Sequence, residues 1–400
     1  MKTVAQVPRT EGARFGRENE PSTLRIGMLC HNYAPHLGGV EVVVQNLGRK
    51  LAQTHQVTIV TAAWGENGGT SREGGMEVHR LPALHVSEKL GIPYPVPLGP
   101  GAARALKALA SVDVLHAHGA LYPLSLTAAA VSMWRRIPLV LTEHVGFIRY
   151  SRAAVNALER AAWRIVGDRV LRASTAVTTL NERIAGWLRE RSPTCSPRLI
   201  GNGVDTQRFR PLNARERRAR RASFQLPQDQ TLVLFAGRDN PKKNLDVVLR
   251  IPRKSFHLVV CGHRRELRGE NLTDLGLLPH EAMPDLYGCV DLLVHAATGE
   301  GFPLAVQEAL ASSLPVALLW DEGYLTSIDR NVVRGCNSFE ELSEEVKALS
   351  KDATQRASLS AQSRATAARL WSWDATASSY LQVYRECLDA SCAGAHEMGA

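Results

Sequence analysis

The sequence predicts an α/β protein built from two parallel-sheet domains. Its 400 residues exceed what one typical hydrophobic core accommodates, so two domains are expected. Apolar runs of strand length alternate with helix-like stretches in two successive series, and this alternation is typical of parallel sheets covered on both faces. Ligands of such sheets bind at the carboxyl ends of the strands. The residues that directly follow each apolar run are therefore the candidate site residues.

The first series of strands and helices occupies the amino-terminal half of the chain. Its apolar runs have strand length, and two of them end in histidines. The predicted strands are 24–30, 57–62, 76–82, 112–118, 138–144 and 174–180, and the predicted helices are 40–54, 102–109, 126–134 and 150–173.

The second series begins after an arginine-rich stretch at 213–224. Its predicted strands are 231–237, 256–262, a weaker run near Leu272, 291–297 and 314–319. A closing segment at 371–387 has aromatic and aliphatic residues at helical intervals, so it is expected to pack on a preformed surface. The predicted units are a disordered tail (1–22), an N-terminal domain (23–196), a C-terminal domain (197–368), a helix packing on the N-terminal domain (369–390) and a second tail (391–400).

Composition and charge narrow the class of protein. The net charge of +9 favours an anionic partner without identifying it. Seven cysteines without any C-x-x-C pair argue against a disulfide framework or a zinc site, and they favour a reducing cytoplasm. The first 22 residues lack the apolar core of a signal peptide, and no apolar run approaches the roughly 18 residues that cross a bilayer.

The segment EGFPLAVQE (300–308) places two carboxylates across a predicted strand-to-helix turn. A helix that starts near Phe302 or Pro303 leaves its first backbone N–H groups free to bind an anion. Glu300 would lie in the preceding loop and Glu308 inside the helix, so one segment could hold phosphates and a ribose diol. The alternative is an ordinary loop–helix joint with two solvated acids.

Other candidates lie at the ends of first-series strands. Gly38 and Gly39 follow the first strand, but their spacing is not the dinucleotide G-x-G-x-x-G pattern, and a tight turn without a ligand is the alternative. His116 and His118 point to one side of their strand. His118 is nearer its carboxyl end and better placed to meet a substrate, whereas a core role is expected for His116. Asn202 lies in a turn of the interdomain linker, for which a structural role is favoured.

Cations follow the first strand of the second series. Arg238 comes directly after this strand, and Lys243 follows five residues later, with Lys242 competing for the same role. A guanidinium and an ammonium at one strand end could bind a leaving diphosphate. Solvated loop cations are the alternative.

Two arginine clusters admit several interpretations. The cluster at 215–221 contains no interleaved aromatic residues, so a solvated helix face is favoured over a nucleic-acid site. The second cluster resembles a basic amphipathic surface, for which docking to anionic lipid is the alternative to a helix that covers the first sheet. Its arginines are Arg149, Arg152, Arg160, Arg164, Arg169 and Arg172.

The motifs, taken in order, resemble family 4 of the retaining glycosyltransferases. The matching segments are GGVE, HAH, TEH, GNGVD, GRDNPKKN, EGFPLAVQE and a closing WSWD helix, across residues 24–388. This resemblance implies the GT-B architecture, in which two Rossmann-like parallel-sheet domains face each other across a cleft. It implies an acceptor-binding N-terminal domain, a nucleotide-sugar-binding C-terminal domain and a C-terminal helix that crosses back to the first.

The resemblance also implies roles for individual residues. Gly38 and Gly39 would lie near the donor phosphates, and His118 would contact the donor sugar. Arg238 and Lys243 would bind the diphosphate. The remaining implied roles are sugar hydroxyl binding by Glu300, backbone contacts from Gly301, Phe302, Pro303 and Leu304, ribose binding by Glu308, and acceptor-side positions at His31, Tyr33, Glu143, His144 and Asn202.

The implied reaction moves a sugar from a nucleoside diphosphate sugar to a small-molecule or glycan acceptor with retention of configuration. UDP is the favoured donor base and GDP the alternative; neither a metal nor another cofactor is expected. Nucleic acid is not an expected partner, whereas peripheral contact with the inner face of the membrane is compatible with the basic clusters. A sugar-nucleotide epimerase and a non-catalytic nucleotide-sugar-binding protein are the competing functions.

The sequence departs from the family pattern after the second glutamate. SSLPV (312–316) lacks the usual glycine of the turn. The glycine-rich loop that usually follows the next strand is replaced by LLWDEGYLTSIDR (318–330), and 331–339 is shortened. Donor-base and acceptor preferences therefore cannot be copied from relatives.

Overall fold

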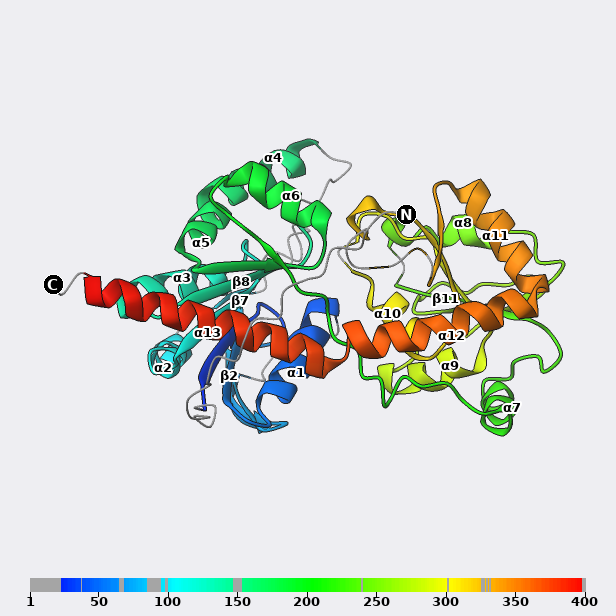
Figure 1. Cartoon of the computed structure of the whole chain (residues 1–400), viewed down its shortest axis with the longest axis horizontal. Helices are drawn as coiled ribbons and strands as arrows, with labels where there is room; N and C mark the ends of the chain where they lie inside the picture. Colours follow the sequence, from blue (N-terminus) through cyan, green and yellow to red (C-terminus); the bar gives the residue numbers. More distant parts are fainter. Residues whose placement is uncertain are drawn as a thin grey trace, which may run out of the picture.

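The computed structural model contains two open α/β sheets, each with its own helices (Figure 1). It describes residues 23–36, 38–64, 68–84, 95–97, 100–146, 153–238, 240–300, 302–324, 328, 330 and 332–397. The predicted fold class is confirmed, including a C-terminal helix that returns to the first domain. Among the described residues, none of the helices is both long and apolar enough to span a membrane.

The first sheet has eight strands in the order β10-β9-β8-β7-β1-β2-β4-β3. All neighbours are parallel except β3, which pairs antiparallel with β4 and was not predicted. The strands are β1 (Arg25–Leu29), β2 (Gln56–Ala62), β3 (Gly69–Glu73), β4 (Met76–Leu81), β7 (Val114–His118), β8 (Leu139–Glu143), β9 (Ala176–Thr179) and β10 (Arg198–Leu199); β5 (Ala83–Leu84) and β6 (Val96–Pro97) form a separate pair.

Helices cover both faces of this sheet. One face carries α1 and the C-terminal helix α13 (Trp373–Glu397), and the other carries α2, α3, α5 and α6. Their bounds are α1 (Gly39–Leu51), α2 (Pro100–Leu109), α3 (Pro123–Arg135), α4 (Ala153–Ala162), a π-helical turn (Trp163–Gly167), α5 (Asp168–Ala173) and α6 (Glu182–Arg191).

The second sheet has six parallel strands in the order β13-β12-β11-β14-β15-β16. They are β11 (Leu232–Ala236), β12 (His257–Cys261), β13 (Leu272–Asp274), β14 (Leu292–His295), β15 (Val316–Leu319) and β16 (Arg334–Cys336). The helices of this domain are α7 (Ala214–Ser223), α8 (Leu245–Leu249), α9 (Met283–Cys289), α10 (Leu304–Ala311), α11 (Phe339–Lys351) and α12 (Ala353–Leu370), with 3₁₀ turns at Pro241–Lys243, His280–Ala282 and Glu322–Tyr324.

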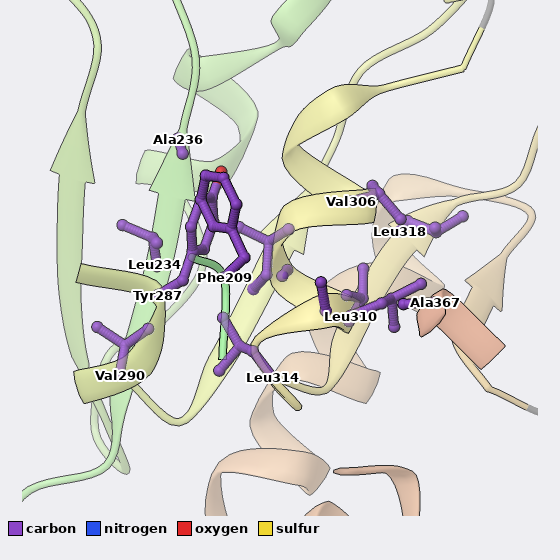
Figure 2. Packing of buried hydrophobic residues seen from close by; sticks show 14 of the residues in the cluster. Phe209, Leu234, Ala236, Tyr287, Val290, Val306, Leu310, Leu314, Leu318 and Ala367 are labelled. Atoms are coloured by element: carbon purple, nitrogen blue, oxygen red, sulfur yellow. The ribbon is translucent and has the colours of Figure 1, made fainter. Parts of the chain in front are cut away.

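A dense apolar cluster holds α10 against the second sheet. Val306 and Leu310 on α10 pack with Leu234 and Leu318 of the strands and with Ala367 of α12 (Figure 2). Full burial of each such leucine or valine contributes roughly 1.5–3 kcal/mol. This packing fixes the position of α10 and of the glutamate that it carries.

The structure corrects three predictions: one domain boundary, the continuity of one helix and the end of another. The boundary after Ser196 removes β10 from the first domain, although this strand pairs with β9 of the first sheet. The predicted helix at 150–173 is interrupted by the π turn, with Trp163 buried in the core. Finally, α13 continues beyond the predicted end at 390 to Glu397.

The C-terminal helix packs on the first sheet and makes polar contacts with it. The hydroxyl of Tyr384 lies 2.7 Å from Nδ1 of His116, and the hydroxyl of Tyr380 lies 3.1 Å from Oγ1 of Thr142. Thr142 also lies 2.7 Å from Nε2 of His116. The core role predicted for His116 therefore agrees with its position, because both of its ring nitrogens bond to buried hydroxyl groups.

The turn without the family glycine keeps its backbone geometry. The amide of Leu314 donates to the carbonyl of Ala309 at 2.8 Å, and that of Ser313 donates to Leu310 at 3.1 Å. These two bonds form a Schellman motif, which places Ser313 in the left-handed region at φ 58°. A serine therefore occupies a conformation that glycine adopts without strain.

Replacement of Ser313 by glycine is expected to raise the free energy of unfolding by about 0.5–1 kcal/mol, because left-handed strain is relieved while some chain entropy is lost. The melting temperature should rise by about 2–4 °C for each kcal/mol gained. Calorimetry measures it, and Ser312→Gly is the matched control, since Ser312 has φ −80°. Equal effects of the two substitutions would contradict the strain argument.

Candidate functional site

The site begins with Glu300, which lies between two basic side chains at the end of β14. One carboxylate oxygen is 2.6 Å from Nζ of Lys243, and the other is 3.0 Å from Nε2 of His295. Burial alone would raise the pKa of Glu300, but the hydrogen bonds and charges of His295 and Lys243 lower it to about 2. Glu300 is therefore ionised near neutral pH and oriented by both partners.

Lys243 and Lys242 occupy different environments, although both lie in one 3₁₀ turn. Lys243 contacts Glu300 directly. The pKa of Lys242 is lowered by burial and by the nearby Arg183. Lys243 is therefore the better candidate for the second cation of the clamp. Arg238 follows β11 on the same edge of the sheet and is exposed, with its guanidinium available to a ligand.

Glu308 lies on α10 with its carboxylate directed at the 3₁₀ turn before α9. Its Oε1 is 2.8 Å from Nε2 of His280. The phenol of Tyr287 lies beside it, and the pKa of Tyr287 is raised by burial and by this carboxylate. Glu308 is 8% exposed, so only a small part of it can contact a ligand.

The start of α10 differs slightly from the prediction. Pro303 is the N-cap, with ψ 118°, and the helix begins at Leu304 rather than at Phe302 or Pro303. The amides of Leu304 and Ala305 lie in the first turn and have no carbonyl four residues earlier within the helix. They are available to an anion, whereas Phe302 is buried against Trp371 with ring centroids 5.2 Å apart. Gly301 lies outside the described residues.

His118 is fully buried at the end of β7 and is neutral. Its Nδ1 is 3.0 Å from Nε2 of His144, and its ring lies 4.1 Å from that of His116. Burial lowers the pKa of His118 well below its ordinary value, and the two neighbouring histidines lower it further. The Nε2 atom of His118 has no hydrogen-bond partner within the described structure.

The glycine loop after β1 is covered by a carboxylate. Glu41, in the first turn of α1, pairs with Nδ1 of His36 at 2.9 Å. Its oxygens approach so closely that a Cβ on Gly38 would lie 2.2 Å from Oε2 of Glu41, so a larger residue at 38 would require the Glu41 side chain to move. Gly39 is the first residue of α1 and faces open space, where a ligand could approach its backbone.

The five predicted acceptor-side residues are all buried. His31 stacks on Tyr122 with ring centroids 3.6 Å apart. Glu143 accepts hydrogen bonds from the amides of Ala120, Val145 and Gly146, so its carboxylate supports the surrounding loops. The other three are Tyr33, His144 and Asn202, at 1%, 6% and 5% exposure.

Contacts between the domains add three residues to the site that were not predicted from the sequence: Asn181, Arg183 and Gln307. Arg183, near the start of α6, donates to the carbonyl of Glu300 at 2.8 Å and pairs with Asp321 at 3.4 Å. Asn181, the N-cap of α6, donates to the same carbonyl at 3.4 Å. The carbonyl of Asn202 accepts from Gln307 on α10 at 2.6 Å.

The segment that departs from the family pattern takes part in these contacts. Gly323 and Asp321 lie against Arg183 and Asn181, and Tyr324 is fully buried. Residues 325–327, 329 and 331 of this segment lie outside the described residues. Two further partners, His295 and His280, were not predicted. His295 ends β14, but the apolar run predicted at 291–297 extends two residues past it, so the rule that selected His118 at the end of its run did not select His295.

The arrangement defines a class of protein. The second sheet carries an ionised carboxylate, a cation and the N-terminus of α10 beside its strand ends, and Asn181 and Arg183 of the first domain donate to the carbonyl of Glu300, as expected for a GT-B glycosyltransferase. Residues 37–208 match the family model described as Glycosyltransferase Family 4, and residues 216–366 match the model described as Glycosyl transferases group 1.

Known proteins agree with this class. A GDP-mannose-dependent alpha-mannosyltransferase of Mycobacterium tuberculosis is 30% identical over 73% of the chain and 78% of the relative. D-inositol 3-phosphate glycosyltransferase 1 of Catenulispora acidiphila is 28% identical over 88% and 91%. The sucrose-phosphate synthase structure from Thermosynechococcus elongatus superposes with a TM-score of 0.75, at 20% identity, over 92% of the chain and all of that structure. The chain belongs to glycosyltransferase family 4.

Proposed function

We propose that the protein transfers a sugar from a nucleoside diphosphate sugar to an acceptor hydroxyl with retention of configuration. The observation that carries this proposal is Glu300, held ionised between Lys243 and His295 beside the N-terminus of α10. Glu300 would bind sugar hydroxyls and Lys243 would bind a diphosphate, and the two groups lie 2.6 Å apart. Such preorganised charge stabilises a transition state in which the leaving group becomes negative.

Donor binding would divide among residues of the second domain. Glu308 would accept hydrogen bonds from the ribose diol, and the first-turn amides of α10 would bind the diphosphate with Lys243 and Arg238. Sequence analysis favours a uridine donor, whereas the mannosyltransferase relative is named for GDP-mannose. The experiment below therefore compares both bases.

The chemical step would break the bond between C1 of the sugar and the diphosphate oxygen. The acceptor oxygen then bonds to C1 on the same face, and its proton passes to the leaving phosphate oxygen. Lys243, Arg238 and the N-terminus of α10 supply positive charge to the leaving group, so we propose that no divalent metal is required. The unpartnered Nε2 of His118 would meet the donor sugar when the cleft closes around it.

The acceptor would bind on the first-domain side, near the stacked rings of His31 and Tyr122. We propose a small-molecule or glycan acceptor in bacterial natural-product or cell-envelope biosynthesis. A cytoplasmic location is supported by the free state of the six described cysteines.

The test measures thermal stabilisation by UDP, GDP and ADP without metal, followed by transfer from the corresponding sugar donors to acceptor mixtures, with products identified by mass spectrometry. We expect one nucleotide to stabilise the protein and one donor to yield a glycosylated product with retained configuration. Isomerisation of the donor without an acceptor would indicate an epimerase instead. Binding without any turnover would favour a non-catalytic protein, and no stabilisation by any nucleotide would count against the proposal.

A further inference from the structure

One face of the first domain combines unneutralised arginines with exposed apolar side chains. It is formed by α3, α4, the π turn and α5, where α3 packs alongside α5, and α4 and α5 lie on the outer edge of this domain in Figure 1. We call it the α3–α5 face. Among the described residues, its exposed arginines are Arg135, Arg136, Arg160, Arg164, Arg169 and Arg172; Arg149 and Arg152 of the predicted cluster lie outside the described residues.

These arginines lack acidic partners. Within the described part of the chain, none of the six guanidinium groups forms an ion pair with a carboxylate. The helices of this face contribute two acids, Glu159 and Asp168. Asp168 is paired with Arg191 of α6 at 2.5 Å. Arg169 and Arg172 donate only to helix carbonyls, of Ile165 and Asp168. The positive charge of the face is therefore available to an external anion.

The other arginine cluster is organised differently. On α7, Arg217 and Arg221 both pair with Asp291 at 2.7 Å, and Arg220 pairs with Asp285 at 3.0 Å. Arg221 is also buried. That cluster fastens α7 to its own domain, so an abundance of arginine does not by itself make an unpaired basic surface.

Apolar side chains are exposed on the same elements. Met133 and Trp134, at the end of α3, are 68% and 70% exposed, and Leu158 and Ile165 are 53% and 60% exposed. The guanidinium of Arg135 lies 5.2 Å from the ring of Trp134. Exposed tryptophan, methionine and isoleucine next to arginines are the side chains that bind the boundary between lipid headgroups and acyl chains.

We propose that the α3–α5 face docks the protein on an anionic lipid surface. The arginines would bind headgroup phosphates, and Met133, Trp134, Leu158 and Ile165 would enter the interfacial layer. Charge complementarity selects this partner, because guanidinium groups without acidic partners and exposed apolar side chains lie on the same helices, and an aqueous polyanion would leave the apolar side chains exposed. The proposal is independent of donor chemistry, so its failure would leave the proposed glycosyl transfer untouched.

The test is co-sedimentation of the full chain with vesicles of phosphatidylcholine alone and of equal parts phosphatidylcholine and phosphatidylglycerol. We expect binding only to the mixed vesicles, weakened by added salt. Each arginine near an anionic surface contributes roughly a fivefold change in partition, so the double variant Arg160→Glu/Arg164→Glu should lower binding by at least about tenfold. Met133→Ser/Trp134→Ser should also weaken binding, through loss of apolar insertion.

The matched control is Arg215→Glu/Arg218→Glu, which makes the same change of charge on exposed positions of α7. It should bind like the wild-type protein, and circular dichroism checks that all variants are folded. Equal loss in the α7 variant would show non-specific attraction and overturn the proposal, as would absence of binding to mixed vesicles. Self-association that Met133→Ser/Trp134→Ser abolishes in light scattering would instead make this face an interface between copies, also overturning it.

Discussion

Replacement of Lys243 by alanine is expected to lower kcat by about 10²–10³-fold, in the range seen when one group that stabilises transition-state charge is removed. The ammonium of Lys243 lies 2.6 Å from Glu300, at the strand end where the diphosphate would leave. Its removal takes away a positive charge that stabilises the leaving diphosphate, whose negative charge increases as the C1–O bond breaks. It also removes one of the two groups that hold the pKa of Glu300 near 2. Steady-state transfer assays with the donor found by the nucleotide panel measure this effect.

Lys242→Ala is the matched control, since it removes the same side chain one residue away in the same turn. Lys242 does not contact Glu300, and its environment includes Arg183. We expect this variant to retain kcat within a factor of about ten, as for removal of an indirect electrostatic contribution. If the Lys242 variant loses more activity than the Lys243 variant, the assignment of the cation is wrong.

Replacement of Glu308 by alanine is expected to weaken nucleotide binding by about 10- to 100-fold, because hydrogen bonds to a charged group contribute about 1.5–3 kcal/mol. Glu308 is 8% exposed, and its carboxylate is oriented by His280 at 2.8 Å. Thermal stabilisation by the nucleoside diphosphate should fall accordingly. Calorimetric titration gives the Kd directly.

Glu281→Ala provides the comparison for this second prediction. Glu281 is exposed in the same 3₁₀ turn as His280, so its loss removes an equal charge near the site without touching the carboxylate on α10. Its Kd should match that of the wild type. His280→Ala should produce a smaller loss than Glu308→Ala, because it disturbs only the orientation of the carboxylate. Wild-type affinity in the Glu308 variant would rule out its role at the ribose.

Local patterns were sufficient for most strands and helices. Each buried parallel strand is a short apolar run, so 231–237 and 256–262 could be identified without knowing their neighbours. The antiparallel strand β3 was missed because its residues are mostly exposed and carry no apolar run. The π turn was missed because its width follows from packing of Trp163, which the spacing of apolar residues does not report.

The site was predictable where a residue follows its own strand and unpredictable where another element supplies the partner. Arg238 comes directly after an apolar run, His118 ends one, and Glu300 and Lys243 follow within a few residues of one. The contacts of Arg183 with Glu300 and Asp321 join positions more than a hundred residues apart, and the linker contact of Asn202 with Gln307 does the same. Their partnership depends on how the two sheets face each other.

The sequence by itself determined the α/β class, the family and the two glutamates of EGFPLAVQE, because apolar runs, strand-end residues and motif order are local properties of the chain. Tertiary structure alone decided that Glu300 is ionised between Lys243 and His295, that Glu41 covers Gly38, and that a serine adopts the conformation of the missing glycine. Each of these depends on distances of a few ångströms in the folded chain, either between loops, as for Lys243 and Glu300, or within one turn, as for Glu41 and Gly38 and for Ser313. Charge state, burial and backbone strain follow from those distances, and residue order does not contain them.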